Sequence, residues 1–172
     1  PAVHGLNRRV IIRGLRGWRT LFISEEYPMS TVEAVCTSSK KGTVKREQPE
    51  VVLKTGYGIE GDAHAGDWHR QVSLLAAESI DQVLEVLPSL KHGAFAENII
   101  TRGIDLACLG LGRRVQIGAS VVLEITQIGK ECHNSGCAIK KATGDCIMPR
   151  EGLFAKVVEG GTIAAGDPIV AL

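Results

Sequence analysis

Long apolar runs are absent from this sequence. The run at residues 121–123 ends at Glu124, far short of the roughly 20 residues that a membrane-spanning helix needs. No segment combines an apolar stretch with a small-residue cleavage site, as a secretory signal would. We therefore expect a soluble, cytoplasmic protein without a membrane segment.

Cysteines and aromatic residues are also scarce. The five cysteines are an odd number and aromatics make up 4% of the chain, which argues against a secreted fold held together by disulfides. The 172 residues, of which 44% are apolar and 23% charged, fit one globular domain and are too few for two full catalytic domains. Glycine is plentiful, with 20 residues, and indicates many tight turns.

A large net charge is missing as well, since the formal net charge is +1. Five arginines lie before Met29, but they form no recognisable nucleic-acid-binding motif, so we predict no nucleic-acid partner. Met29 opens a strand-like segment. We predict that residues 1–28 are an N-terminal extension, disordered or derived from expression, and that residues 29–172 form the domain.

Short apolar segments bounded by glycine turns follow one another along the domain. One helix is predicted where Ile80, Val83, Leu84 and Leu87 recur at helical spacing before Pro88. Many short strands with one or two helices favour a mainly β fold, closed or nearly closed into a barrel with the helices packed on it. The predicted strands are residues 32–36, 51–53, 72–75, 98–101, 114–117, 121–127, 153–158 and 168–171.

Reactive side chains are concentrated in the stretch GKECHNSGCAIKKATGDCIMPREG, which contains Cys132, His133, Cys137 and Cys146. A cysteine reacts as its thiolate, which nearby cations and backbone amides stabilise. The stretch supplies such cations, so Cys132 and Cys137 are candidate catalytic residues and Cys146 is left open. Cys36 and Cys108 are predicted to be buried apolar groups. The cations are Lys130, His133, Lys140, Lys141 and Arg150.

Two further segments could form a site. The glycine-rich loop at residues 56–70 brings His64, His69 and Arg70 together, as an anion pocket or as a turn whose histidines hydrogen-bond the loop. Glu97 and Asn98 precede a strand, where such side chains orient a ligand or tie down loops. For Glu97 we expect the tying role, because loop carboxylates usually accept from nearby backbone amides.

Several segments in order resemble a stand-alone MOSC domain, the module also found at the C-terminus of molybdenum cofactor sulfurases. They are GIEGDAHAGDWHRQVSLLA, GAFAENI, LGLGRRVQIG, EITQIGKECH and GDCIMPREGLFAKVVEGGTIAAGD, and the resemblance covers residues 31–172. It implies a MOSC-type β-barrel and a role in handling sulfur or the molybdenum cofactor (molybdopterin), with no covalently bound cofactor.

The resemblance implies that a cysteine accepts persulfide sulfur from a pyridoxal-phosphate cysteine desulfurase and passes it to a cofactor or a partner protein. Cys132 matches the family's marked cysteine, and Cys137 is the other possibility. Such a chain would show sulfurtransferase-like activity together with a desulfurase, and its partners would be that desulfurase or molybdenum-cofactor biosynthesis proteins. The candidate cofactor-binding residues are His64, His69, Arg70, Asn98, Lys130, His133 and Arg150.

Two other functions use the same residues. In a molybdenum-cofactor carrier or insertion module, Cys132 would ligate molybdenum directly. In a structural zinc module, Cys132, His133, Cys137 and Cys146 would bind the ion, although no two of these cysteines have the usual two-residue separation. No dinucleotide or phosphate-loop fingerprint is present.

Overall fold

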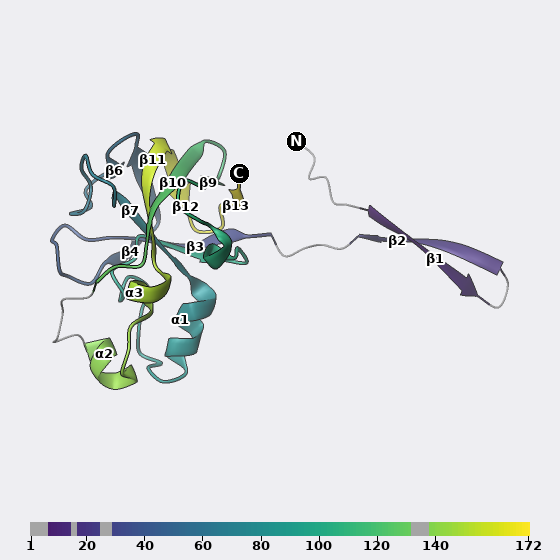
Figure 1. The fold of residues 1–172 in the computed structure, drawn as a ribbon, viewed down its shortest axis with the longest axis horizontal. Coiled ribbons are helices and arrows are strands. Elements are labelled where there is room, and N and C mark those ends of the chain that lie inside the picture. Colours follow the sequence, from purple (N-terminus) through teal and green to yellow (C-terminus); the bar gives the residue numbers. More distant parts are fainter. Residues whose placement is uncertain (1–6, 15–16, 25–28, 132–137) are drawn as a thin grey trace.

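The computed structural model describes residues 7–14, 17–24, 29–131 and 138–172. This part of the chain is mainly β, with short helices, as the sequence predicts (Figure 1). It contains no helix with the length and apolar character needed to cross a membrane.

The largest sheet has eight strands in the order β13-β9-β10-β11-β7-β8-β3-β4. Its neighbours pair antiparallel except β7 and β8, which are parallel. A parallel pair needs a crossover connection, and here the crossover contains helix α1 (Ala77–Leu84). The strands are β3 (Thr31–Thr37), β4 (Arg46–Gln48), β7 (Val72–Ala76), β8 (Ile99–Arg102), β9 (Arg114–Ile117), β10 (Val121–Ile128), β11 (Leu153–Glu159) and β13 (Ile169–Ala171).

The expected closed barrel is not confirmed, because no sheet in the described residues closes on itself and the large sheet keeps β13 and β4 as edges. The sheet nevertheless curls until the start of β3 meets the residues before β13. Thr31 forms an isolated bridge with Pro168, and the Val32 amide donates to the Asp167 carbonyl at 2.8 Å. Local backbone hydrogen bonds therefore join these two parts of the sheet without a continuous ladder.

A second sheet has the order β12-β5-β6, and its strands pair antiparallel. Alternate residues of β5, Val51 and Leu53, are buried, as expected for a strand with one face on the core. β12 was not among the predicted strands, because Gly160 and Gly161, the latter its first residue, favour a turn. The strands are β5 (Glu50–Lys54), β6 (Gly58–Ile59) and β12 (Gly161–Ala164).

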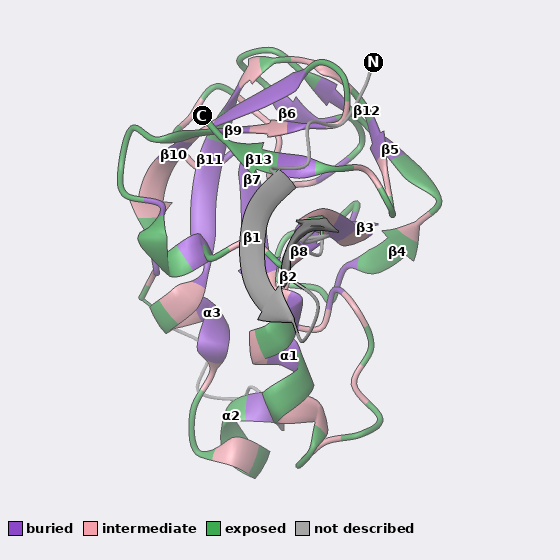
Figure 2. Cartoon of the chain, turned by 90° about the vertical axis from the view of Figure 1, so that its right-hand side faces the viewer, coloured by how far each residue is buried: buried purple, intermediate pink, exposed green. Residues whose placement is uncertain are grey.

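Two apolar clusters cover opposite faces of the central strands. Leu74 and Ile99 belong to the cluster between the sheets, whereas their neighbours Leu75 and Ile100 belong to the cluster under the helices. Successive strand residues point to opposite faces, so β7 and β8 are buried on both sides and read as continuous apolar runs. Figure 2 shows the buried residues along β7 and β11.

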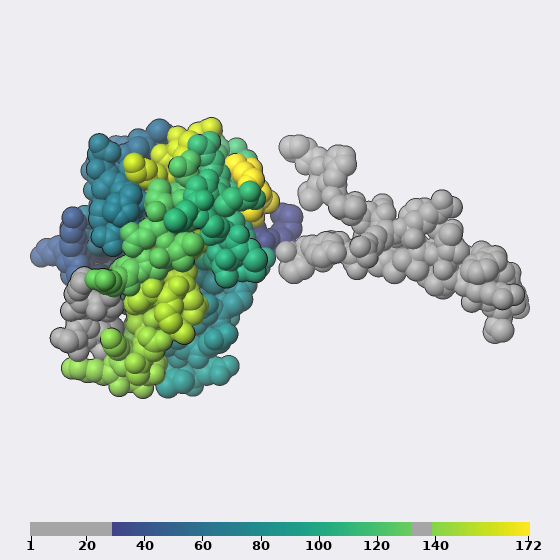
Figure 3. Space-filling view, viewed as in Figure 1, coloured from purple at the N-terminus to yellow at the C-terminus, as the bar shows by residue number. Residues whose placement is uncertain are grey.

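The predicted helix is confirmed as α1, with Ile80 buried against the second cluster. Two shorter helices, α2 (Ala138–Thr143) and α3 (Ile147–Glu151), and a 3-10 turn, η1 (Leu106–Cys108), complete the domain. The surface formed by residues 138–151 is light green to yellow in Figure 3, beside the teal of α1. Ile139 and Ile147 pack into the same cluster as Ile80.

Before the domain, β1 (Asn7–Gly14) and β2 (Gly17–Ser24) form an antiparallel hairpin, with Asn7 opposite Ser24. Among the described residues these two strands pair only with each other.

Candidate functional site

A cavity of about 760 Å³ lies where loops from both halves of the domain meet. The loop between β3 and β4 supplies Lys41, the loop between β6 and β7 supplies His64 and Arg70, and the end of β10 leads to Lys130. The remaining described lining residues are Gly42, Thr43, Val44, Trp68, Ser73, Leu90, Ala94, Phe95, Ala96, Asn98, Glu131, Ile139, Cys146, Met148, Pro149 and Phe154.

Arg70 is held at this cavity by aromatic rings. Its guanidinium carbon lies 4.9 Å from the centre of the Trp68 ring and 5.7 Å from that of Phe154, within the range of a cation–π interaction. Its Nε is buried and has no hydrogen-bond partner in the described part of the chain. A buried polar atom of this kind normally has a partner, so Arg70 has unused capacity to donate to a ligand.

Two lysines extend this arrangement on either side. The Lys41 ammonium lies 5.7 Å from the Trp68 ring centre, and the Lys130 ammonium lies 5.8 Å from that of Phe154. Three cations therefore alternate with two aromatic rings along the cavity wall. Glu131 is the acidic residue of this lining, so the described wall carries a positive net charge.

A buried ion pair lies behind the wall. The Lys45 ammonium is 2.5 Å from Asp62 Oδ2, and neither side chain is more than 1% exposed. Burial opposes ionisation of Asp62, but hydrogen bonds from His64 and Lys45 and the charge of Lys45 outweigh it and lower the pKa of Asp62. Burial also lowers the pKa of Lys45, which Asp62 partly offsets.

Asp62 connects this pair to residues at the cavity. Its Oδ2 also accepts from the Ser38 amide at 3.1 Å and from Asn98 Nδ2 at 3.2 Å. Its Oδ1 accepts from the His64 amide at 2.9 Å. Since His64 and Asn98 both line the cavity, the buried carboxylate fixes two parts of the wall.

Asn98 lines the cavity, and its amide is engaged by the protein. Its oxygen accepts from the Ser73 amide and hydroxyl at 3.2 and 3.1 Å, while its nitrogen donates to the Cys36 carbonyl at 3.0 Å and to Asp62. These contacts join β3 to β7 and to the loop after β6. The structure therefore gives Asn98 a role in positioning the wall.

Glu97 holds its own loop in place through hydrogen bonds, as expected. It is fully buried and accepts from the amides of Gly93 and Phe95 at 2.6 and 2.9 Å. Burial raises the pKa of Glu97, partly offset by these bonds. Gly93 has φ +87°, and a Cβ there would collide with the Lys45 carbonyl, so this loop can pack on Lys45 only with glycine.

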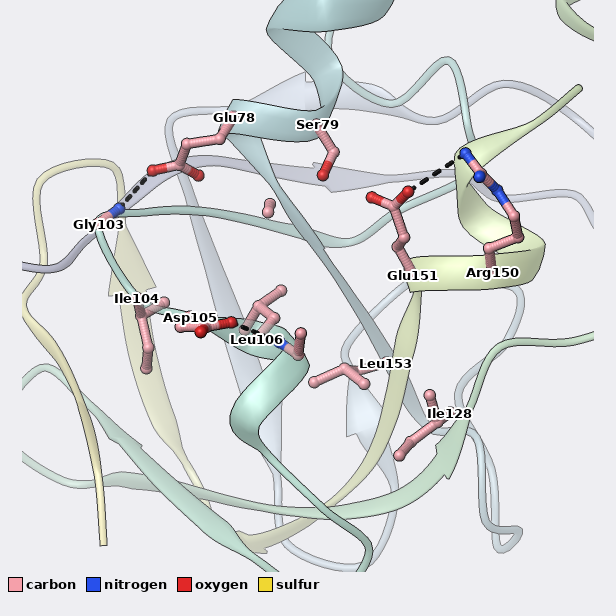
Figure 4. Close-up of a pocket in the computed structure, with 12 residues that line it drawn as sticks. Glu78, Ser79, Gly103, Ile104, Asp105, Leu106, Ile128, Arg150, Glu151 and Leu153 are labelled. Carbon is pink, nitrogen blue, oxygen red and sulfur yellow. Dashed lines mark hydrogen bonds and ion pairs between the residues drawn. The ribbon is translucent and has the colours of Figure 1, made fainter.

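Two predicted residues lie away from the cavity. His69 is exposed, and its Nε2 is 3.0 Å from Gln127 Oε1. Arg150 lines a second cavity of about 580 Å³ and forms ion pairs with Asp145 at 3.0 Å and Glu151 at 3.3 Å. Figure 4 shows this second cavity, with Glu151 directed from α3 toward the space below α1.

The cysteines differ in environment. Cys36 is fully buried, as predicted, and burial raises its pKa to about 12. The prediction for Cys108 was wrong, because it is exposed on η1 and its Sγ donates to Asp105 Oδ2 at 3.0 Å. Cys146 is half-buried and lines the first cavity.

The predicted residues Cys132, His133 and Cys137 lie outside the described residues. The zinc hypothesis depends on these three and Cys146. In the part of the chain that the structure describes, no group of three His, Cys, Asp or Glu residues is arranged to hold a metal ion.

Several site residues were missed from the sequence. Lys45 and Asp62 pair across two loops, and Trp68 and Phe154 meet around Arg70 from a loop and a strand. Tertiary packing alone brings these together. The one available signal was compositional: in a chain with few aromatics, Trp68 lies two residues from Arg70.

Comparisons with known proteins identify the kind of domain. The family model of the MOSC domain matches residues 61–170. The fold is similar to that of YuaD from Bacillus subtilis, with a TM-score of 0.67 and 20% identity over 82% of this chain and 94% of that one. It is also similar to YiiM from Geobacillus stearothermophilus, with a TM-score of 0.61 and 16% identity over 83% of this chain and 75% of that one. No curated protein matches the chain.

Proposed function

Because the chain belongs to the MOSC domain family, which includes the C-terminal module of molybdenum cofactor sulfurases, we propose that it handles the molybdenum cofactor. The cavity binds the anionic cofactor, and Cys132 or Cys137 carries persulfide sulfur for it. The donor is a cysteine desulfurase, and the acceptor is the cofactor or a protein of its biosynthesis.

The observation that carries this proposal is the state of Arg70. A guanidinium that has a buried Nε without a described partner, beside two lysines, suits an anion such as a phosphate. The volume of about 760 Å³ lies within the usual range of ligand pockets, roughly 300–1,000 Å³. The residues present therefore fit an anionic organic cofactor.

Each part of the wall has a distinct task in this proposal. Arg70, Lys41 and Lys130 hold the anionic group, and Trp68 and Phe154 keep Arg70 in place and exclude water from one side of it. Asn98 positions the wall, and His64 faces the ligand. The bound cofactor supplies a metal centre whose sulfur and oxygen ligands can be exchanged.

Chain connectivity supports placing the sulfur carrier at this cavity. Glu131 and Ile139 both line it, and Cys132 follows Glu131 directly, with consecutive Cα atoms about 3.8 Å apart. In the transfer step, the cysteine thiolate attacks the terminal sulfur of the donor's persulfide. A new sulfur–sulfur bond forms as the donor's breaks, and the donor leaves as a thiolate, so no external oxidant is needed.

The binding part is tested with Arg70→Met and the control Arg114→Gln, since Arg114 is exposed and pairs with Glu124 on β10. Calorimetric titration with inorganic molybdate should show affinity reduced about tenfold or more in Arg70→Met, because a charge-assisted hydrogen bond is lost. Fluorescent oxidised pterin extracted from the purified protein should decrease in parallel. Equal binding by wild type and Arg70→Met, or no pterin and no molybdate binding in the wild type, contradicts the proposal.

The sulfur part is tested by intact mass spectrometry after incubation with a cysteine desulfurase and cysteine. One added sulfur atom, removed by a reductant, should appear in the wild type and in the exposed-cysteine control Cys108→Ser, and disappear in either Cys132→Ser or Cys137→Ser. If both of these variants still gain sulfur, neither cysteine is the carrier. Pterin retention without any sulfur uptake would instead favour the carrier module in which Cys132 ligates molybdenum.

A further inference from the structure

We propose that Thr126 is a positioning residue of the candidate site, whose hydroxyl determines where Arg70 lies in the cavity wall. Thr126 does not belong to the described lining of the cavity, so it acts through Arg70 and not on a ligand. That Thr126 holds Arg70 in place is inferred from the described contacts alone. The consequence for ligand binding rests on the proposed function.

A β-bulge in β10 brings Thr126 to the loop before β7. Thr126 has no partner across the ladder, because the register between β10 and β11 shifts between Ile125 and Gln127. An extra residue of this kind bends its strand and re-aims a side chain. Neighbouring side chains of a regular strand point to opposite faces, yet Thr126 and Gln127 both contact His69. The bulge thus lets two successive side chains of β10 reach the loop that carries Arg70.

The Thr126 hydroxyl lies between two backbone carbonyls. It is within hydrogen-bonding distance of the His69 carbonyl and 3.1 Å from the Phe154 carbonyl. A hydroxyl has one proton to donate, so it donates to one of these oxygens at a time or shares its proton between them. In either case a single side-chain atom connects the loop before β7 to β11.

Both carbonyls belong to the immediate surroundings of Arg70. The His69 carbonyl and the Arg70 amide are parts of one planar peptide unit, so a bond to this oxygen fixes the plane next to which the Arg70 side chain begins. Phe154 supplies one of the two rings beside the guanidinium, whose carbon lies 5.7 Å from the ring centre. Thr126 therefore sets the Arg70 backbone relative to a ring on which the Arg70 side chain packs.

Regular strand pairing does not perform this task. β7 begins at Val72, so Arg70 lies before the first residue of β7 that pairs with β11. Gln71 anchors the chain on the following side of Arg70, because its side chain accepts from the Val157 amide at 2.9 Å. Thr126 provides the anchor on the preceding side, where the ladder has not yet begun.

The position of Arg70 matters because its binding capacity has a direction. Its buried Nε has no partner in the described part of the chain, and a guanidinium donates in a rigid, planar geometry. A side chain that is already held in place loses less freedom when a ligand binds, which favours binding. Removal of the Thr126 hydroxyl should therefore weaken binding without changing any charge of the wall.

The direct test is the Nε–H signal of Arg70 in a proton–nitrogen NMR spectrum of the ligand-free protein, assigned through Arg70→Met. A proton held beside aromatic rings has a shifted resonance, and a buried one exchanges slowly with water. We expect such a signal in the wild type and in Thr126→Ser, which keeps the hydroxyl. In Thr126→Val, which has the same shape without the hydroxyl, the signal should move toward the position of a free arginine and exchange faster.

Two outcomes of this measurement overturn the inference. One is a wild-type signal at the position of a free arginine, and the other is a signal that Thr126→Val leaves unchanged. Thr126→Ala also removes the hydroxyl, should reproduce the effect of Thr126→Val, and decides the matter if Thr126→Val does not fold.

The matched control is Thr162→Val, which removes the hydroxyl of an exposed residue on β12, in the other sheet. This variant should keep the wild-type signal of Arg70. If it changes the signal as much as Thr126→Val does, the effect is not specific to Thr126 and the inference is wrong.

The ligand arm is calorimetric titration with inorganic molybdate. Thr126→Val should bind about fivefold more weakly, as expected for the loss of roughly one hydrogen bond, whereas Thr126→Ser and Thr162→Val should bind like the wild type. Undiminished binding by Thr126→Val overturns the role in binding. Absence of binding by the wild type counts against the proposed function, and the NMR signal still decides whether Thr126 positions Arg70.

Discussion

At the scale of single residues, the burial of Lys45 makes a strong prediction. Lys45→Met leaves the Asp62 carboxylate ionised in the interior without its ammonium partner. Breaking a buried pair in this way costs roughly 3–5 kcal/mol of unfolding free energy. Urea denaturation at neutral pH measures it.

The matched control for Lys45→Met is the double variant Lys45→Met/Asp62→Asn, which removes both charges. It should recover much of the lost stability, because no unpaired charge remains in the interior. A loss below about 1 kcal/mol in the single variant would show that water reaches Asp62, contrary to its burial.

Cys108 allows a test of a hydrogen bond at the surface. Its Sγ–H donates to Asp105, and this bond is the main cause of the raised pKa of the thiol. Asp105→Asn keeps an oxygen for the Ala107 amide that caps η1 but removes the negative charge. Alkylation of Cys108 by iodoacetamide, followed by mass spectrometry, should become several-fold faster, because the thiolate is the reactive form.

Cys36 provides the internal reference in the same alkylation experiment. It is buried and has a pKa of about 12, so it should stay unmodified in the folded protein and react only after denaturation. An unchanged rate for Cys108 in Asp105→Asn would mean that the bond does not control its ionisation.

The structure brings only some of the predicted site residues to one cavity. His64, Arg70, Asn98 and Lys130 all line the cavity, whereas His69 and Arg150 do not. His69 adjoins Arg70, but it lies in a bend of the loop and its ring contacts Gln127 of β10. A one-residue difference of this kind depends on the register of the folded chain, and no spacing rule applied to a loop supplies it.

At the scale of elements, α3 is fixed to the end of β10 by close backbone contact. The Gly129 amide donates to the Gly152 carbonyl at 2.7 Å, and the Lys130 amide donates to the Pro149 carbonyl at 3.1 Å. Gly129 has φ +63°, and a Cβ there would collide with the Pro149 oxygen. The glycine thus sets the distance between Lys130 and the Met148–Pro149 part of the cavity wall.

Gly129→Ala should therefore destabilise the protein and weaken molybdate binding. The control is Gly112→Ala, since Gly112 has φ +77° but no atom within 4 Å of an added Cβ. The control should lose about 1–2 kcal/mol for the left-handed backbone alone, and Gly129→Ala should lose more because of the collision. Thermal unfolding of both variants measures the difference, and equal losses would show that α3 moves freely away from Gly129.

Strands that coincide with apolar runs of the sequence were predicted, and the two shortest α-helices were not. The strands β10 and β11 are largely apolar, β-branched runs between glycines, which is the pattern that strand rules use. α2 and α3 have six and five residues, too few for helical periodicity to show, and Pro149 lies within α3. Such helices are stabilised by packing against the second cluster more than by local sequence.

At the scale of the whole molecule, the buried ion pair predicts acid sensitivity. The pKa of Asp62 in the folded protein lies below its ordinary value of 3.8. Its stabilising contribution is therefore complete above this value and is lost as the pH falls below it. The unfolding free energy of the wild type should decrease between about pH 4 and pH 2.

The slope of this decrease should be shallower in Lys45→Met/Asp62→Asn. Glu97 acts in the opposite direction, since its raised pKa makes its contribution grow on acidification. It is present in both proteins, so it cancels in the comparison. Identical slopes in denaturant titrations of the two proteins would contradict the assignment to Asp62.

The mainly β character of the domain was predicted from the sequence, but its sheet order was not. The crossover between β7 and β8 and the curling of the sheet bring segments from both halves of the domain to one cavity. Pairings between distant segments leave no local pattern in a single sequence. The resemblance to the MOSC family supplied the expectation of a barrel, which the described sheets do not complete.

The hydrogen bonds between Ser30–Val32 and residues 166–169 affect the order in which the chain can fold during translation. The Ile169 amide donates to the Ser30 carbonyl at 2.9 Å, and Gly166 donates to Val32 at 2.8 Å. A nascent chain cannot form these bonds until residues 166–169 have left the ribosome, because distant contacts must await synthesis of both partners. During translation the first residues of β3, Thr31 and Val32, lack these partners, although β4 and β8 can already flank the rest of the strand.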